Sequence, residues 1–280
     1  YIDTVANKYG LQNKKILHDE QYFEKNLVSV FYRRGGILYP LTIAMEQIAQ
    51  QASSDVKVIL TGAGADGLFL GHSRLQEMYN DNDIVNHEQY FTNKDARELF
   101  NWSNEKEHMA KNSRMKFLYN FNKSVRAKVQ MLGFYFGSNH YHEMLDYTYM
   151  KYSVVGRIPF LSQSFAKKML GIPYKKLVGD DLGWHKRFRG KLPLKNLVAK
   201  DFGKEFAFRD KIGFTTPWFI WMYSDFCYNL IISIIKTSDI VNTHIKKIHL
   251  DDICQKTGVY NTREYRKLFW SILNLGSLQV

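Results

Sequence analysis

The segment VKVILTGAGADGLFLGH, residues 56–72, joins two apolar runs through a glycine-rich turn. The β-branched run Val56–Leu60 is typical of a buried strand, and the apolar run that begins at Leu68 has helical spacing. Between them lies the sequence T-G-A-G-A-D, residues 61–66. A strand that passes through glycines into a helix lets backbone N–H groups approach an anion or a nucleotide closely. The segment therefore predicts a strand, a tight turn and a helix with a candidate phosphate site between them.

Asp66 supplies a carboxylate at the point where the predicted helix begins. Carboxylate oxygens are the hard ligands that Mg²⁺ accepts beside the phosphates of a nucleotide. In the alternative interpretation, the segment is an ordinary strand-to-helix turn in which Asp66 only caps the helix. The turn alone does not decide between these two interpretations, because glycine-rich turns are common.

Strand and helix patterns alternate in the first part of the chain. Helices are predicted over residues 1–9 (closed by Gly10), 20–32 (ended by Gly35 and Gly36) and 41–51, with short strands over 15–17 and 56–60. This alternation predicts an α/β fold with a parallel sheet, residues 56–60 as its central strand and ligands at the carboxyl ends of the strands.

Beyond about residue 88 the patterns are almost entirely helical, as over residues 123–134 and 251–275. The polar stretch over residues 80–93 is typical of a loop between two parts. We therefore expect residues 1–80 to be the C-terminal part of an α/β nucleotide-binding sheet. Residues 81–280 are expected to form a mostly helical part that completes the active-site cleft.

Composition is typical of an enzyme domain in a reducing compartment, and we expect a cytoplasmic protein. Two cysteines give no disulfide framework, and 45% hydrophobic residues suffice for a large core. The net charge of +12 indicates an anionic partner, for which ATP or an acidic substrate would suffice. The lysines are scattered, so no nucleic-acid partner is expected. Residues 217–235 approach transmembrane length, but Asp225 interrupts them, which predicts a buried amphipathic helix and no membrane span.

Four blocks of the sequence resemble, in the same order, motifs of the asparagine synthetase family. Residues 61–72 resemble its S-G-E-G-A-D-E-L-F-G-G-Y, and MLDYTYMKYSVVGRIPFL, residues 144–161, resembles its K-V-D-R-M-S-M-A-N-S-L-E-A-R-V-P-F-L. Residues 191–195 resemble its K-x-x-L-R, and residues 209–214 its R-x-K-x-G-F. The resemblance covers nearly the whole chain. It implies an ATP-pyrophosphatase fold, of the adenine nucleotide alpha hydrolase-like type, that uses ATP and Mg²⁺.

The family activates a carboxylate as an acyl-adenylate, which an amine then attacks to give an amide. By this resemblance Asp66 holds the metal, and Lys191 and Lys211 face the departing pyrophosphate. The nucleotide-binding positions are Leu60, Thr61, Gly62, Ala63 and Gly64.

Arg157 and the pair His140 and His142 are further candidates from the residues themselves. Arg157 begins an extended segment before Pro159, where a guanidinium could orient a carboxylate or a phosphate. It could equally be the buried partner of Asp146, which would be a structural role. The two histidines diverge on a helix, and no third metal ligand is evident beside them.

The chain departs from the family pattern in ways that bear on the reaction. Ala63 and Val155 stand where the family has Glu, and neither side chain can accept a proton. Gly67 replaces the Glu that follows Asp66. The family's phosphate loop, S-G-G-x-D-S, is absent from the 280 residues, as is the glutaminase domain. Either the loop lies on another chain, or it was removed, or the protein has lost adenylation. For an active ligase we expect an upstream segment or a partner chain to carry the phosphate loop.

These observations predict an ATP-dependent amide-forming ligase with an altered acceptor site. Its substrate is a carboxylate, an amino acid or a peptide; a peptide-amide former, like the lasso-peptide macrocyclases of this superfamily, would tolerate the lost Glu residues best. The alternative is a catalytically degenerate relative that serves as a peptide- or subunit-binding scaffold. A third interpretation, an RNA-binding relative, rests on charge alone.

Overall fold

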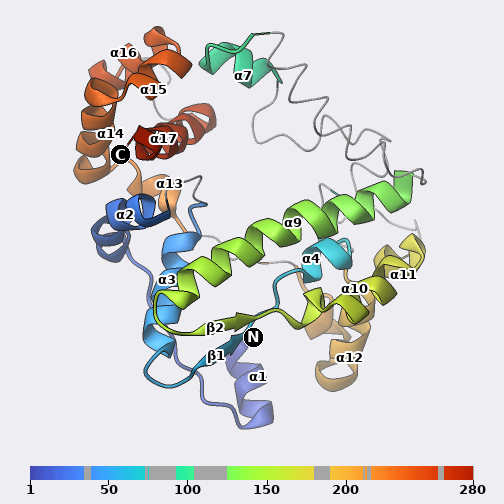
Figure 1. Cartoon of the computed structure of the whole chain (residues 1–280). Coiled ribbons are helices and arrows are strands. Elements are labelled where there is room, and N and C mark those ends of the chain that lie inside the picture. Colours follow the sequence, from blue (N-terminus) through green and yellow to red (C-terminus); the bar gives the residue numbers. More distant parts are fainter. Residues whose placement is uncertain are drawn as a thin grey trace. The chain divides into compact units, whose positions relative to one another are not determined.

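The computed structural model describes residues 1–34, 39–72, 75, 93–103, 125–179, 190–210, 212, 216–257 and 262–279. Figure 1 shows the chain with its elements labelled. The elements are α1 (Ile2–Tyr9), α2 (Glu20–Arg34), α3 (Thr42–Ala52), β1 (Val58–Leu60), α4 (Ala65–Leu68), α7 (Asn93–Leu99), α9 (Val125–Met150), β2 (Val155–Arg157), η1 (Pro159–Leu161), α10 (Gln163–Leu170), α11 (Tyr174–Val178), α12 (Leu192–Ala207), α13 (Trp218–Trp221), α14 (Asp225–Thr237), α15 (Asp239–His244), α16 (Lys247–Gln255), α17 (Arg263–Gly276) and η2 (Ser277–Gln279).

The chain divides into two compact units. The first consists of Tyr1–Leu17, Ile48–His87 and Asn120–Phe214, and the second of His18–Gln47, Glu88–Tyr119 and Thr215–Val280. Each unit therefore combines segments that are distant in the sequence. The boundary expected near residue 80 lies outside the described residues and stays a prediction. The loop expected over residues 80–93 also lies outside them, except for Asn93, which is the first residue of α7.

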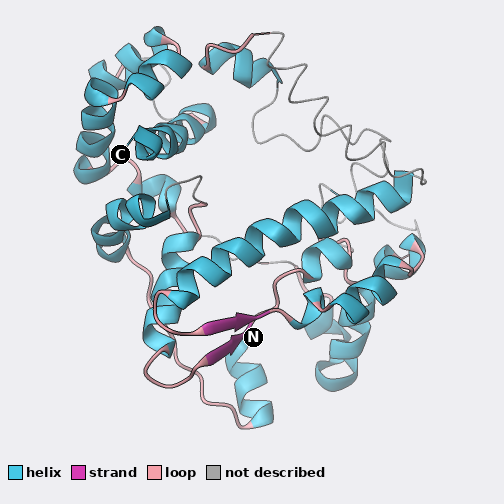
Figure 2. Ribbon diagram, in the orientation of Figure 1, coloured by secondary structure: helices cyan, strands magenta, loops and turns pink. Residues whose placement is uncertain are grey.

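The first unit contains a small parallel sheet, shown in magenta in Figure 2. Strand β1 pairs with β2 in parallel, with Val58 opposite Val155 and Leu60 opposite Arg157. The described part of the chain is thus a mostly helical α/β structure with a two-stranded sheet. The strand predicted from residues 56–60 is confirmed, but β2 was missed because three residues before a proline give no periodic signal.

The prediction that residues 56–60 form a buried central strand is wrong for the described part of the chain. Val56, Val58 and Leu60 are 43%, 49% and 72% exposed. Alternate residues of a strand share one face, so these three side chains form one uncovered apolar face. In the described residues β1 has a partner on one side only, which leaves its other edge and this face open.

Helix α4 packs against α9 through two glycines. A Cβ atom at Gly67 would overlap the carbonyl of Gly133, so the two backbones are in direct contact. The helix expected from Leu68 onward instead begins at Ala65 and ends at Leu68, and Leu70 has a positive φ of 52°. The close contact explains why residue 67 is glycine and cannot carry the Glu of the family pattern without moving α4.

Three predicted helices near the N-terminus are confirmed as α1, α2 and α3. Helix α1 ends at Gly10, whose φ of 62° is the left-handed cap that this glycine predicts. Gly35 and Gly36 lie outside the described residues. The strand predicted over residues 15–17 is wrong: the structure has no regular element there, and Leu17 is 79% exposed. A strand needs a pairing partner, and no described segment supplies one to these residues.

The second unit is a helical domain around one hydrophobic core. Its fully buried residues include Phe23, Leu27, Ile231, Leu268 and Phe269. The helix predicted over residues 251–275 is two helices, α16 and α17. The apolar stretch over residues 217–235 also contains two helices, since Ser224 caps α14 through a hydrogen bond from Cys227 N. In the described part of the chain, no helix is both long enough and apolar enough to cross a membrane.

Candidate active site

Asp66 and Lys191 form an ion pair in the first unit. Lys191 Nζ lies 2.8 Å from Asp66 Oδ1, and the two side chains are 28% and 33% exposed, respectively. Asp66 is in the first turn of α4, and Lys191 precedes the first residue of α12. Because water still reaches both groups of this partly exposed ion pair, Lys191 can bind an incoming anion, or Asp66 an incoming cation, in place of its present partner.

The backbone beneath this pair leaves no room for side chains. A Cβ atom at Gly71 would overlap both Asp66 Oδ1 and Lys191 Cε, and one at Gly190 would overlap the carbonyl of Leu70. Lys191 N donates to the Phe69 carbonyl at 2.8 Å, which holds residues 190–191 against the turn after α4. Two glycines therefore bring a carboxylate and an ammonium group to one point.

Lys191 has a left-handed backbone conformation, with φ 63° and ψ 26°. Non-glycine residues rarely adopt this region, and when they do the surrounding structure must hold them there. Pro193 follows within the first turn of α12 and fixes the start of that helix. The strained position of Lys191 is thus built into the beginning of α12.

The pair lies on the wall of a cavity of about 630 Å³, which we call the phosphate cavity. Of the predicted site residues that the structure describes, only Asp66 and Lys191 line it. Lys211 lies outside the described residues. Its neighbours Asp210 and Ile212 both line the phosphate cavity, as does Arg209. Arg209 belongs to the sequence block of residues 209–214, but the sequence indicates no role for it, because only the fold places it at this cavity.

The predicted nucleotide-binding turn follows β1 directly. Thr61 N donates to the Arg157 carbonyl at 2.9 Å, and Thr61 Oγ1 accepts from Ala63 N at 3.1 Å. Gly62 has open space where a Cβ would be, whereas at Gly64 a Cβ would overlap Leu161. The turn is therefore tight and open on the Gly62 side. Its residues and Leu60 do not line the phosphate cavity in the described structure.

Arg157 and Asp146 are both exposed, and no ion pair joins them in the described structure. The alternative that Arg157 is the buried partner of Asp146 is therefore wrong. Arg157 lies at the carboxyl end of β2, in register with Leu60, and does not line the phosphate cavity. His142 is exposed, and the side chain of His140 lies outside the described set.

The described residues fit a magnesium ion held partly by a nucleotide. They contain no group of three or more His, Cys, Asp or Glu side chains that could hold a metal by themselves. Mg²⁺ usually binds one or two carboxylates and completes its shell with water and phosphate oxygens. Asp66, with Asp210 on the wall of the same cavity, supplies that kind of donor set.

The asparagine synthase family model matches residues 1–279. The chain belongs to the asparagine synthase family. Membership supports an ATP-dependent ligase of the asparagine synthetase type, with ATP and a carboxylate as its substrates. No curated protein matches the chain. Within the asparagine synthase family pattern, the retained Asp66 and Lys191 are the residues that the fold brings together.

Proposed function

We propose that this domain uses ATP and Mg²⁺ to activate a carboxylate as an acyl-adenylate and then joins the acyl group to an amine. The ion pair between Asp66 and Lys191 on the wall of the phosphate cavity is the observation that carries this proposal. Adenylation needs a metal ligand and a cation at the same few phosphate oxygens. A carboxylate and an ammonium group 2.8 Å apart can supply both once a nucleotide separates them.

Each charged residue has a distinct task in this proposal. Asp66 would hold Mg²⁺, and the ion would neutralise charge on the phosphates as the bond breaks. Lys191 leaves Asp66 and donates to the pyrophosphate. Lys211, two residues after Arg209 in the sequence, supplies the second ammonium group. Arg157, at the end of β2, orients a carboxylate or a phosphate.

The proposed reaction has two steps that balance. A carboxylate oxygen of the substrate attacks the α-phosphorus, and the bond from that phosphorus to the bridging oxygen breaks, so that pyrophosphate leaves. An amine then attacks the acyl carbon, the bond to the AMP oxygen breaks, and the amine loses one proton. Lys191 and Lys211 act in the first step because the charge of the leaving pyrophosphate grows there.

The second step takes place in an altered acceptor site. Ala63 and Val155 stand where the family pattern has carboxylates, and neither can take the proton from the amine. Val155 is the first residue of β2, opposite Val58, and Ala63 lies in the turn that follows β1. We propose that the amine is delivered in place by its own substrate, so that proximity replaces part of the missing base.

A phosphate loop from outside the 280 residues completes the proposed site. The hydrogen bonds from Val155 N to the Lys57 carbonyl and from Thr61 N to the Arg157 carbonyl show that the residues on either side of β1 direct these backbone groups to β2. Val58 and Leu60 alternate with them and direct their backbone groups to the open edge. A parallel strand added at this edge would end beside Thr61, because parallel strands end on the same side. A loop that follows such a strand would then lie next to Gly62.

Trapping of the activated acyl group with hydroxylamine tests the proposal. The chain is incubated with ATP, Mg²⁺ and a panel of carboxylic acids, alone and with a protein segment that supplies an S-G-G-x-D-S loop. We expect acyl hydroxamate and AMP in equal amounts, and far more of both when the loop is present. The absence of hydroxamate with every acid in both preparations would contradict the proposal and favour a binding scaffold.

A further inference from the structure

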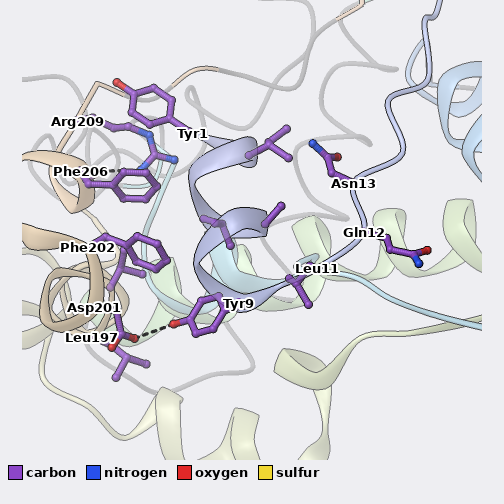
Figure 3. A pocket seen from close by; sticks show the side chains of 14 residues that line it. Tyr1, Tyr9, Leu11, Gln12, Asn13, Leu197, Asp201, Phe202, Phe206 and Arg209 are labelled. Atoms are coloured by element: carbon purple, nitrogen blue, oxygen red, sulfur yellow. Dashed lines mark hydrogen bonds between the residues drawn. The ribbon is translucent and has the colours of Figure 1, made fainter.

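A second cavity, of about 620 Å³, lies between α1 and α12 (Figure 3). Four aromatic side chains that line it form a continuous row of ring contacts: Tyr1, Phe206, Phe202 and Tyr9. We call these four side chains the aromatic wall. Tyr1 meets Phe206 edge to face at 5.3 Å between ring centroids, and Tyr9 meets Phe202 in the same way at 5.8 Å. Phe202 and Phe206 stack at 4.8 Å.

A kink in α12 sets the positions of the two phenylalanines. Gly203 has φ 82° and ψ 164°, a conformation that is essentially restricted to glycine, and it separates Phe202 from Phe206. Apart from its chain neighbours and the backbone of its own helix, no atom lies within 4 Å of the position of a Cβ at Gly203. The glycine is therefore required for its backbone angles and not for space, and the angles place two rings on one side of the cavity.

Arg209 closes one end of the aromatic wall. Its guanidinium carbon lies 4.3 Å from the centroid of Tyr1 and 4.6 Å from that of Phe206, and Nη1 donates to the Phe206 carbonyl at 2.7 Å. Arg209, Tyr1, Ile2 and Val198 line both this cavity and the phosphate cavity. The two cavities therefore share a wall, and the shared wall carries a positive charge.

The other end of the aromatic wall carries a carboxylate with an ammonium group beside it. Asp201 Oδ2 accepts a hydrogen bond from Tyr9 at 3.1 Å (Figure 3). Lys8 donates to the Asp201 carbonyl, and its ammonium nitrogen lies 4.6 Å from the centroid of the Phe202 ring. The charges of Lys8 and Asp201 offset each other, so an anion in the cavity is attracted toward Arg209 at the opposite end. Between these ends the cavity offers rings and aliphatic side chains, such as Val5 and Leu197. Its middle thus suits hydrocarbon, and its polarity orients a carboxylate toward the phosphate cavity.

From these contacts we propose that the aromatic wall binds the side chain of the carboxylate substrate. The substrate class is then an amino acid or peptide whose activated residue has an aromatic or large aliphatic side chain, and not a small acidic one. The identification of the ligand as the substrate rests on the proposed function. The binding of an aromatic ring beside the aromatic wall does not depend on the proposed function. Ring contacts with bound aromatic groups stabilise a complex through apolar area and edge or offset geometry.

Ligand-observed NMR on the 280-residue chain tests the site without requiring turnover. The probes are N-acetyl-L-phenylalanine and N-acetyl-L-aspartate, each titrated in the absence of ATP. We expect the phenylalanine probe to bind at least about tenfold more tightly, since a ring that leaves water for an apolar wall gains affinity in proportion to its buried area. Equal affinity of the two probes would overturn the proposal.

Two pairs of variants show where the probe binds. Leu197 lines the cavity and is 58% exposed, so Leu197→Trp can fill the cavity without disturbing a core. Ile248→Trp, at a 64% exposed position in the second unit, is its control. Phe202→Ala removes one ring, with Phe226→Ala at an exposed position as its control. We expect only Leu197→Trp and Phe202→Ala to weaken binding, by about tenfold, in chains that circular dichroism shows to be folded. Unchanged binding in Leu197→Trp would place the ligand elsewhere and overturn the proposal.

The hydroxamate assay separates this proposal from the proposed function. If the phenylalanine probe binds at the aromatic wall but no acid yields hydroxamate, the ligase function fails and the apolar site stands. If N-acetyl-L-aspartate yields hydroxamate as fast as the phenylalanine probe and Leu197→Trp has no effect, the substrate assignment fails and the ligase function stands.

Discussion

Lys191 Nζ lies 2.8 Å from Asp66 Oδ1, although the two residues come from distant segments of the first unit's sequence. The two groups neutralise each other's charge in this structure. Both side chains are about one third exposed, so a bound Mg²⁺ and phosphate can take over the two partners without first uncovering a buried charge. The proposed site is therefore assembled before its substrates arrive.

Gly71 tests whether this assembly matters for activity. Gly71→Ala places a methyl group against Asp66 Oδ1 and Lys191 Cε, and the pair must separate or shift. We expect hydroxamate formation to fall by about a hundredfold, the order of loss that a 1 Å misplacement of a reacting group causes. Gly171→Ala is the control, because its Cβ meets only atoms at ordinary contact distances of 3.5 Å or more. An active Gly71→Ala enzyme would show that the pair is not part of the machinery.

Gly67→Glu restores the family residue at the contact between α4 and α9. The new Cβ overlaps the Gly133 carbonyl, so α4 must move away from α9. We expect the free energy of unfolding to fall by about 2 kcal/mol, as for other overpacked sites. Urea denaturation measures it, with Gly62→Glu as the control at a glycine that has open space. Equal stability of the two variants would mean that the glycine contact is not tight.

Gly67 also marks the limit of what the sequence could predict. The strand at residues 58–60, the turn after it and the helices α1, α2 and α3 follow from local patterns and were predicted. The reason for glycine at position 67 depends on Gly133, which only the fold brings next to it. Strand β2 has three residues and gains its stability from pairing with β1, so no local pattern indicates it.

The same distinction holds for the candidate site. The resemblance in sequence singled out Asp66 and Lys191, but it gave no role to the residues around them. Gly71, Gly190 and Arg209 act through backbone contact and stacking, which depend on the positions of distant segments. The aromatic wall could not be predicted from the sequence either, because its rings come from the two ends of α1 and from both sides of the kink at Gly203.

His18 gives the second unit a stability that depends on pH. Its Nδ1 lies 2.8 Å from Gln47 Oε1, and its Nε2 is buried with no partner among the described residues. Burial lowers the pKa of His18 below its usual value of 6.5. The unfolded chain therefore takes up a proton at a pH at which the folded chain does not. Stability should fall as the pH drops from 7 through 6.5, and become constant below the folded pKa.

Urea denaturation between pH 7.5 and 5 measures this effect. We expect His18→Gln to flatten the dependence, because glutamine does not titrate. His244→Gln is the control at an exposed position. A slope in His18→Gln as steep as in the original chain would assign the effect to other groups.

The two cysteines should differ in reactivity. Cys227 is fully buried, and burial raises the pKa of its thiol to about 11, so almost no thiolate forms near neutral pH. Cys254 is exposed. We expect a disulfide reagent at pH 8 to modify one thiol per folded chain and two in urea, and Cys254→Ser to abolish the reaction of the folded chain. Fast modification of both thiols in the folded chain would contradict the burial of Cys227.

The exchange of labelled pyrophosphate into ATP, dependent on a carboxylic acid, tests the central claim most directly. It is measured with the phosphate loop supplied, for the original chain, Lys191→Met and Lys200→Met. Lys200 is an exposed lysine on α12, the helix that follows Lys191. We predict exchange in the original chain and in Lys200→Met, and a loss of at least about a hundredfold in Lys191→Met, the usual effect of removing one charge-stabilising donor. Exchange that proceeds equally in Lys191→Met, or that needs no carboxylic acid, would contradict the account.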